Sequence, residues 1–341
     1  MSQEETFNDF DAREIRILEA WFMCRNFHAI LIVTLFTVNA MADPLPSWRD
    51  TTVKAAIIEY VAAITDPASP DFVPVPARIA VLDNDGTSWC ERPGYGPTEF
   101  QKSLLHSMVA EGKADGNIMP ISAWLADDRE ALKEFGWSQA YEAMNATFAD
   151  MPVTAYRDSV RAWLDRTPHP VYNTPYTELY YEPMRELRKL LEKNDFKVWM
   201  VTGGAQDFVR AYLEPVFGIP PERVIGTWTT PVYSEGVDGV TMVRGSQQVY
   251  NGHQHKPAHI EMRIGRQPIF AAGNSNNDAP MCLWSISGEY RSLALWIHHD
   301  DAEREYDYDR GTDRIKRLVN DHPSAHEVSM ARDWATIFKE H

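Results

Sequence analysis

The stretch from Ile79 to Thr87 constrains the fold more than any other part of the 341-residue chain. Four apolar residues run without a polar break into Asp83 and Asp85, which one residue separates, and Gly86 follows. An apolar run without alternation is typical of a strand that is buried on both faces of a parallel sheet. Such a strand delivers the residues after it to the sheet edge where open α/β folds bind ligands. The stretch therefore predicts an α/β fold with two carboxylates at a ligand site.

Three later stretches complete a pattern that begins with this pair of aspartates. In chain order they are Val198 to Gly204, Lys256, and Ile269 to Asp278, which ends in Gly-Asn-Ser-Asn-Asn-Asp. The four motifs, in this order, resemble the haloacid dehalogenase (HAD) superfamily and, within it, the phosphoserine-phosphatase-like phosphatases. The second aspartate of the first motif is the mark of that phosphatase branch. The resemblance implies a Rossmann-like parallel-sheet core.

The resemblance also implies a role for each residue of the first three motifs. Asp83 would be the nucleophile and form an aspartyl-phosphate. Asp85 would protonate the leaving oxygen and later deprotonate the attacking water. Thr202, with the amides of Gly203 and the glycine after it, would bind a phosphoryl oxygen, and Lys256 would neutralise the remaining charge.

Two carboxylates beside a phosphate need a cation, and Mg²⁺ suits oxygen ligands. By resemblance, its ligands would be the Asp83 carboxylate, the Asp85 backbone carbonyl and an acid of the fourth motif. The chain departs from the family there, because Asn274 replaces the usual aspartate and Asp278 is the only acid of the motif. Asparagine can bind a cation through its amide oxygen but contributes no charge. Asn274 and Asp278 are therefore both candidate ligands, and Gly86 in place of the usual serine is a second departure.

The region between the first and second motif strands reads as helical, without a buried-strand pattern. An insertion at this place matches the helical cap of phosphoserine-phosphatase-like members. We therefore expect a HAD core made of residues 43–90 and 182–341, and a cap made of residues 91–181 that closes over the site. Glu91 stands near the position where phosphoserine phosphatases place an acid for the substrate amine, which makes it a candidate substrate contact.

The rest of the core region carries weaker patterns. Residues 229–250 alternate and contain Ser-Glu-Gly and Asp-Gly, which predicts antiparallel hairpins. Residues 291–298 are expected to form the last core strand, and the charged tail after Asp300 is expected to form surface helix.

A short apolar segment near the N-terminus predicts export. Residues 29–38 are apolar, follow Arg25 and lead to Ala40-Met41-Ala42, which is the pattern of a secretory signal peptide. The segment is too short for a comfortable membrane span, so the mature chain would have no stable one. We expect residues 1–42 to be an extension and signal peptide, cleaved near Ala42, with Met23 as a possible true start. The alternative is a buried N-terminal helix in a cytoplasmic protein.

The net charge of −16 argues against a nucleic-acid surface, and no cluster of lysine and arginine interrupts it. The expected partner is a small-molecule phosphomonoester. Cys90 and Cys282 each follow a motif, so that a disulfide between them is possible in an exported protein.

Together these patterns predict an exported, Mg²⁺-dependent phosphomonoester hydrolase that acts on a small phosphorylated metabolite, with phosphoserine-like or broad specificity. The substrate is expected to be small because a closing cap limits its size. Two enzyme alternatives use the same residues, a phosphotransferase and a phosphocholine-type phosphatase. The second would need an aromatic cage, for which the candidates are Trp89, Tyr95, Trp124, Trp137, Tyr172, Tyr176, Tyr180 and Tyr181. An alternative of another class, a non-catalytic protein that binds a phosphate ligand, is disfavoured because Asp83, Asp85, Thr202 and Lys256 are all present.

Overall fold

The computed structural model describes residues 42–237 and 239–339. The apolar run over 29–38 and the possible start at Met23 lie outside the described residues, so that export stays a prediction. Among the helices of the described part, none is both long and apolar enough to cross a membrane.

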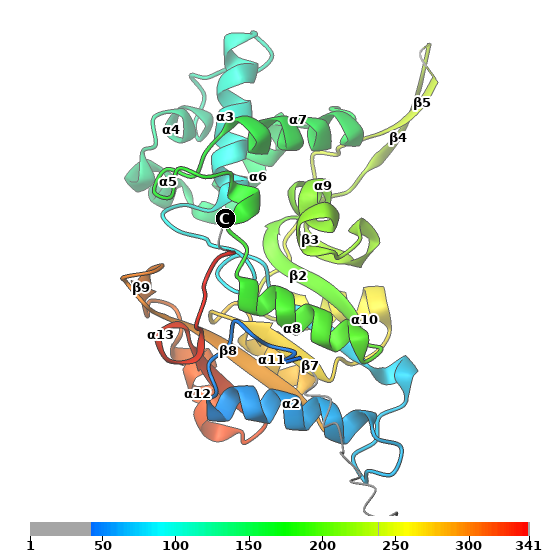
Figure 1. Ribbon diagram of the computed structural model, residues 1–341. Coiled ribbons are helices and arrows are strands. Elements are labelled where there is room, and N and C mark those ends of the chain that lie inside the picture. Colours follow the sequence, from blue (N-terminus) through cyan, green and yellow to red (C-terminus); the bar gives the residue numbers. More distant parts are fainter. Residues whose placement is uncertain (1–41, 238, 340–341) are drawn as a thin grey trace, which may run out of the picture. The chain divides into compact units, whose positions relative to one another are not determined.

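A mainly parallel sheet forms the centre of the described chain and confirms the predicted α/β class (Figure 1). Its strands lie in the order β10-β8-β7-β1-β2-β3-β6, and β9 pairs with β8. The β3–β6 and β8–β9 pairs are antiparallel, and the other pairs are parallel. The strands are β1 (Ile79–Leu82), β2 (Lys197–Ala205), β3 (Val224–Thr229), β6 (Gln248–Val249), β7 (Phe270–Gly273), β8 (Leu293–Asp300), β9 (Asp307–Tyr308) and β10 (Ala325–Ser329).

The strand that carries the first motif lies in the middle of this sheet. All four residues of β1 are buried, and the strand pairs in parallel with β2 on one side and β7 on the other. From β1 the chain builds β2 and β3 outward on one side, then returns to place β7 on the other. This reversal creates a switch point at the carboxyl ends of the strands, where open α/β sheets bind ligands. The polar residues after β1, β2 and β7 therefore meet at one edge.

Helices cover both faces of the sheet, because successive strand residues point to opposite sides. Ala80 and Leu82 belong to a hydrophobic cluster with α2, α8 and α9, whereas Val81 belongs to a second cluster with α10, α11 and α12. These helices are α2 (Thr52–Thr65), α8 (Glu182–Lys193), α9 (Gln206–Phe217), α10 (His255–Ile264), α11 (Ala279–Ser285) and α12 (Asp313–Asp321). The short helix α13 (Met330–Asp333) follows β10.

Five further helices lie between β1 and β2 in the sequence, and Figure 1 shows them gathered together, apart from the sheet. They are α3 (Gly96–Ala110), α4 (Ile121–Leu125), α5 (Arg129–Phe135), α6 (Trp137–Thr147) and α7 (Val153–Arg166). Aromatic residues pack this group against the core: Trp89 stacks on Phe208 of α9, which also contacts Phe100 of α3. The antiparallel hairpin predicted within 229–250 is present as β4 (Val232–Gly236) and β5 (Gly239–Val243).

The prediction that residues 291–298 form the last core strand is wrong, because β10 pairs in parallel with β8 beyond it. The sequence of β10, Ala-His-Glu-Val-Ser, contains no apolar run. As a strand at the end of the sheet order it has one strand neighbour, and His326 and Glu327 keep part of their surface exposed. Such an edge strand lacks the pattern by which buried strands are recognised.

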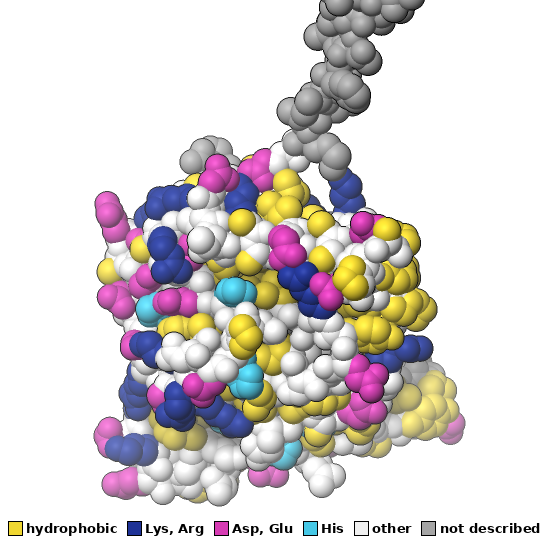
Figure 2. Space-filling view, turned by 90° about the horizontal axis from the view of Figure 1, so that it is seen from below, with side chains coloured by type: hydrophobic (Ala, Val, Ile, Leu, Met, Phe, Trp, Pro, Cys, Tyr) yellow, Lys and Arg dark blue, Asp and Glu magenta, His cyan; other side chains and the backbone are white. Residues whose placement is uncertain are grey.

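On the face shown in Figure 2, lysine and arginine side chains are interspersed with aspartate and glutamate. This face therefore presents no continuous basic patch of the kind that binds nucleic acid.

Candidate active site

The loop after β1 folds tightly on itself and holds both aspartates at the sheet edge. The backbone carbonyl of Asn84 accepts hydrogen bonds from the backbone N–H groups of Thr87, Ser88 and Trp89. The Ser88 hydroxyl donates to the Asp83 carbonyl at 2.7 Å, and the Asp83 N–H donates to Ala272 of β7 at 3.0 Å. The side chains of Asp83 and Asp85 line one cavity.

Lys256 connects the nucleophile candidate to the fourth motif. Its ammonium group donates to Asp83 Oδ1 at 2.6 Å, to Asp278 Oδ1 at 2.6 Å and to the Val201 carbonyl at 2.8 Å. Burial lowers the pKa of Lys256, but the carboxylates of Asp278 and Asp83 outweigh it and raise that pKa above its usual value. All three ammonium hydrogens have protein acceptors, so that Lys256 orients Asp83 and lends its charge to this end of the cavity.

Asp85 contacts the second motif. Thr202 is the last fully buried residue of β2, and its hydroxyl donates to Asp85 Oδ2 at 3.2 Å while accepting from the Gly204 N–H at 2.8 Å. A side chain at Gly204 would lie 3.2 Å from Asp85 Oδ2, so glycine leaves room beside the carboxylate. Burial, followed by the negative charge of Glu91, raises the pKa of Asp85 to about 6. Asp85 can thus carry or release a proton near neutral pH, as a general acid and base must.

The structure distinguishes between the two metal-ligand candidates of the fourth motif. Asp278 is fully buried, and its Oδ1 faces Lys256 while its Oδ2 accepts from the N–H groups of Asn274 and Ser275. Its carboxylate is therefore committed to holding the loop and Lys256. Asn274, in contrast, lines the cavity, and its Oδ1 lies 3.4 Å from the Thr87 hydroxyl, which is 3.5 Å from Asp83 Oδ2. The geometry favours Asn274 over Asp278 as the ligand.

Gly86 and Asn274, the two departures from the family pattern, lie against each other. Gly86 has a φ of +73°, and a Cβ placed there would lie 2.0 Å from Asn274 Nδ2 and 2.9 Å from the Glu91 carboxyl carbon. Asn274 Nδ2 faces Glu91 Oε1 at 3.4 Å, and Glu91 Oε1 accepts from the Tyr308 hydroxyl at 2.6 Å. Glycine at position 86 is thus required both by its backbone conformation and by the approach of the asparagine amide.

A buried pair behind the loop holds the Gly86 carbonyl. His299 Nε2 lies 2.6 Å from that carbonyl oxygen, and His299 Nδ1 lies 2.9 Å from Glu305 Oε2. Both partners are acceptors, so the two contacts are hydrogen bonds only if both ring nitrogens donate, as in an imidazolium facing a carboxylate. Burial raises the pKa of Glu305, but the hydrogen bond and charge of His299, with hydrogen bonds from Cys90 and Tyr181, outweigh burial and hold that pKa below its usual value. Glu305 also accepts from the Cys90 thiol, and Cys90 and Cys282 are not bonded to each other.

The oxygen donors at this end fit Mg²⁺, which prefers a few protein oxygens and retains waters. Asp83 Oδ2 and Asn274 Oδ1 both approach Thr87 Oγ1. Asp85 and Glu91 form no ion pair with any described residue, which leaves this end of the cavity negative overall. The described residues contain no cluster of three or more His, Cys, Asp or Glu suited to a metal. The donor set is therefore weaker in charge than one with an aspartate at position 274.

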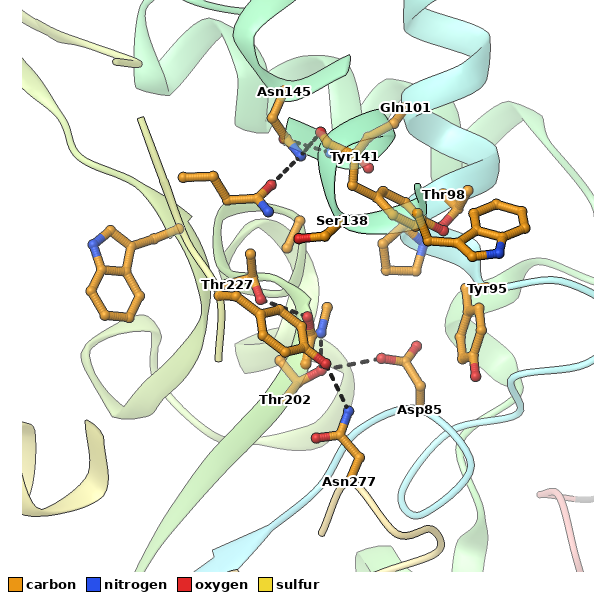
Figure 3. Close-up of a pocket in the computed structure, with 18 of the residues that line it drawn as sticks. Asp85, Tyr95, Thr98, Gln101, Ser138, Tyr141, Asn145, Thr202, Thr227 and Asn277 are labelled. Atoms are coloured by element: carbon orange, nitrogen blue, oxygen red, sulfur yellow. Dashed lines mark hydrogen bonds between the residues drawn. The ribbon is translucent and has the colours of Figure 1, made fainter. Parts of the chain in front are cut away.

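The cavity has a volume of about 470 Å³ and extends well beyond these residues. Figure 3 shows Asp85 and Thr202 at one end, Gln101 and Asn145 at the other, and Tyr95 and Tyr141 along the side. Of the proposed cage aromatics, Tyr95 and Trp137 line the cavity, whereas Trp89, Tyr180 and Tyr181 are buried in the core. Apart from Trp137, sequence reasoning missed the lining residues on α3, α6 and β6, because no motif surrounds them.

We predict that Asp85→Asn stabilises the metal-free protein at high pH. The pKa of Asp85 rises from 3.8 to about 6 on folding, so that its ionisation costs the folded state about 3 kcal/mol. This cost is absent below the unfolded pKa and grows as the pH rises from about 4 to above 6. Urea unfolding in EDTA should show a stability gain from the substitution that is larger at pH 8 than at pH 4. An equal effect at both pH values would contradict the raised pKa.

We predict that Gly86→Ala is far more damaging than Gly112→Ala. Both glycines have positive φ, +73° and +71°, so each substitution costs about 1 kcal/mol of backbone strain. No atom lies within 4 Å of a Cβ at Gly112, whereas a Cβ at Gly86 would displace Asn274 and Glu91. Gly86→Ala should lose a further ~2 kcal/mol of stability and most of the enzymatic activity. Equal loss of activity in the two variants would show that strain alone is responsible.

Comparisons with known proteins agree with this geometry. Residues 80–282, which include all four motifs and more than half of the chain, match the haloacid dehalogenase-like hydrolase family. None of the curated proteins compared with the sequence matches it.

Among solved structures, a conserved protein of unknown function from Anaerococcus prevotii DSM 20548 is similar in fold. It has 13% identity and a TM-score of 0.52, over 80% of this chain and 90% of that one. A phosphoserine phosphohydrolase-like protein from Francisella tularensis subsp. tularensis SCHU S4 has 13% identity and a TM-score of 0.38, over 75% of this chain and 95% of that one. The matched motifs, rather than these distant likenesses, establish that the chain belongs to the haloacid dehalogenase-like hydrolase family.

Proposed function

We propose that this hydrolase is a Mg²⁺-dependent phosphomonoesterase that works through an aspartyl-phosphate on Asp83. The observation that carries the proposal is the arrangement of two carboxylates with different partners at one end of a cavity. Asp83 is held by the Lys256 ammonium, whereas Asp85 is held by the Thr202 hydroxyl and has a raised pKa. One group is thereby suited to attack phosphorus and the other to move a proton.

In the first step, an oxygen of the Asp83 carboxylate attacks phosphorus, and the bond from phosphorus to the substrate alcohol breaks. Asp85 gives its proton to the departing oxygen, which leaves as the alcohol. In the second step, the ionised Asp85 takes a proton from water, whose oxygen attacks the phosphorus. The bond between phosphorus and Asp83 breaks, and inorganic phosphate and the free Asp83 carboxylate result.

Two further groups of the chain assist phosphoryl transfer. The Thr202 hydroxyl and the Gly203 N–H border the cavity beside Asp85, and the hydroxyl can donate to a phosphoryl oxygen once it turns from Asp85 Oδ2. Lys256 keeps Asp83 in place and supplies a positive charge next to the developing negative one. Asp83, the Asp85 carbonyl and Asn274 would hold Mg²⁺, which when bound neutralises charge on the phosphoryl oxygens.

We predict that Asp83→Asn abolishes turnover, because an amide cannot form the acyl phosphate. Phosphate release from p-nitrophenyl phosphate and from alkyl phosphomonoesters, with and without Mg²⁺, measures this. Asp85→Asn should slow alkyl esters much more than p-nitrophenyl phosphate, whose leaving group needs no proton. Substantial turnover by Asp83→Asn would place the nucleophile elsewhere. A wild-type protein that binds phosphate but hydrolyses no ester would instead be a non-catalytic binding protein.

We predict that Asn274→Asp strengthens Mg²⁺ binding and destabilises the metal-free protein. The substitution adds a charge beside the other oxygen donors, but in the absence of metal it places a carboxylate where the amide now faces Glu91 at 3.4 Å. The Mg²⁺ concentration for half-maximal activity should fall by on the order of tenfold, since desolvation offsets most of the Coulomb gain. The melting temperature in EDTA should fall as well.

Asn277→Asp is the matched control, because it adds the same charge to the same loop. Its amide points elsewhere: Oδ1 accepts from the His253 N–H and Nδ2 faces the Tyr250 hydroxyl. An equal gain in Mg²⁺ affinity in both variants would mean that general charge, rather than ligation by residue 274, is responsible.

A further inference from the structure

The catalytic residues occupy one end of the cavity, and the chemistry proposed above leaves the rest of it unexplained. Cavities of several hundred Å³ accommodate drug-sized ligands, and this one measures about 470 Å³. An amino acid phosphate would fill only part of that space. The remaining lining comes from α3, α6, β3 and β6. Its polar groups would contact the alcohol part of the substrate, so their chemistry indicates what that part contains.

A chain of three side-chain amides forms the end of the cavity opposite Asp85, and Figure 3 shows two of them, Gln101 and Asn145. The orientation of the Asn145 amide is fixed by two neighbours, one of which can only accept a hydrogen bond and the other only donate one. Its Nδ2 donates to the Tyr141 carbonyl at 3.0 Å, and its Oδ1 lies 3.3 Å from Arg244 Nη2, which can only donate. The amide of Asn145 therefore cannot be turned over without losing both contacts.

The fixed asparagine in turn orients the two glutamines. Gln101 must present its Nε2 to Asn145 Oδ1, at 2.8 Å, and Gln248 must present its Oε1 to Asn145 Nδ2, at 2.7 Å. This leaves the Gln248 Nε2 donor, which has no hydrogen-bond partner among the described residues, and the Gln101 Oε1 acceptor. The buried Tyr156 hydroxyl also contacts the Gln101 amide, but a carbonyl oxygen has two lone pairs and can accept a second hydrogen bond. Gln101 is only 3% exposed, and both glutamines line the cavity. This end of the cavity thus offers one acceptor and one donor on a rigid frame.

The charges around this frame disfavour a cationic ligand. Arg244, which is 3% exposed, also lines the cavity, contacts Asn145 and pairs with Asp207 at 3.0 Å. Asp207 also pairs with Arg157 at 2.8 Å, so that two guanidinium groups face one carboxylate. A quaternary ammonium or amino group at this end would meet net positive charge.

Aromatic side chains form walls between the two ends. Tyr95, Trp137, Tyr141, Trp228 and Tyr250 line the cavity. The rings of Trp137 and Tyr141 lie with their centroids 6.5 Å apart, and Tyr141 also supplies the carbonyl that orients Asn145. Flat apolar walls leading to a donor and an acceptor suit a planar ring with complementary groups on one edge.

Resting on the proposed phosphomonoesterase function, we propose that the alcohol part of the substrate carries an uncharged, planar heterocycle of the nucleobase type. The substrate class is then a nucleoside monophosphate. Its phosphate would lie at Asp83, and its base would lie between the aromatic walls, with one edge donating to Gln101 Oε1 and accepting from Gln248 Nε2.

The test compares kcat/KM for the four common ribonucleoside 5′-monophosphates with that for ribose 5-phosphate, which lacks only the base. Phosphoserine, phosphocholine and p-nitrophenyl phosphate complete the panel. At least one nucleotide should exceed ribose 5-phosphate by a factor of about ten or more, since a hydrogen-bonded edge and a stacked ring are gained. Gln248→Leu should remove most of this preference, because it should lower kcat/KM for the nucleotide far more than kcat/KM for ribose 5-phosphate.

Gln247→Leu is the matched control, because Gln247 is the exposed neighbour of Gln248 and does not line the cavity. It should leave the preference intact. Two outcomes would overturn the base site while the phosphatase function stands. In the first, the enzyme hydrolyses ribose 5-phosphate, phosphoserine or phosphocholine as well as every nucleotide. In the second, Gln248→Leu leaves the preference for the nucleotide unaffected.

If the wild-type protein hydrolyses nothing, including p-nitrophenyl phosphate, the proposed function fails and the base site is tested by binding alone. Calorimetric titration with the unphosphorylated nucleosides should then show binding to wild type and to Gln247→Leu, and weaker binding to Gln248→Leu. No binding of any nucleoside to the wild type would reject the base site.

Discussion

The hydrogen bonds of the Lys256 ammonium hold the catalytic end of this protein together. Lys256 extends from α10 to Asp83 after β1, to the Val201 carbonyl in β2 and to Asp278 after β7. An ammonium group that is 1% exposed is tolerable only because all three of its hydrogens are bonded and two partners are charged. The same contacts join the carboxyl ends of three adjacent strands, so that loss of this charge would release the nucleophile and two loops together. The arrangement of the strand ends and the position of Asp83 therefore both depend on the buried Lys256 ammonium.

The two departures from the family pattern are a single local solution rather than two separate changes. A side chain at position 86 would occupy the place of the Asn274 amide, and that amide places its oxygen toward Thr87 and its nitrogen toward Glu91. An aspartate at 274 would face Glu91 with like charge unless a cation lay between them. The protein thus combines a less charged donor set at 274 with a buried acid at 91, and glycine at 86 gives both the room they need.

The parts that the sequence predicts well are those governed by local order in the chain. The buried strands β1, β2 and β7 follow from uninterrupted apolar runs, and the motif residues follow from their places after those strands. Tyr308 could not be found in this way, because it reaches Glu91 only after β9 pairs with β8, at a separation of 217 residues. His299 is similar: its contact with the Gly86 carbonyl joins strand β8 to the loop after β1, at a separation of 213 residues. The edge strand β10 was not predicted, because its partly exposed polar residues interrupt the apolar pattern by which buried strands are recognised.

The two ends of the cavity differ in origin, and this difference explains how chemistry and selectivity can vary separately on this fold. Asp83, Asp85, Thr202 and Asn274 lie where three parallel strands end, and their positions are fixed by the sheet itself. Gln101, Asn145 and Gln248 lie instead on α3, α6 and β6, which join through the amide chain rather than through the parallel strands. Replacing these amides changes what the far end can bind without moving the strands that hold the nucleophile. Under the proposed function, substrate choice is therefore a property of the inserted helices and of the edge strand β6, whereas bond breaking is a property of the sheet.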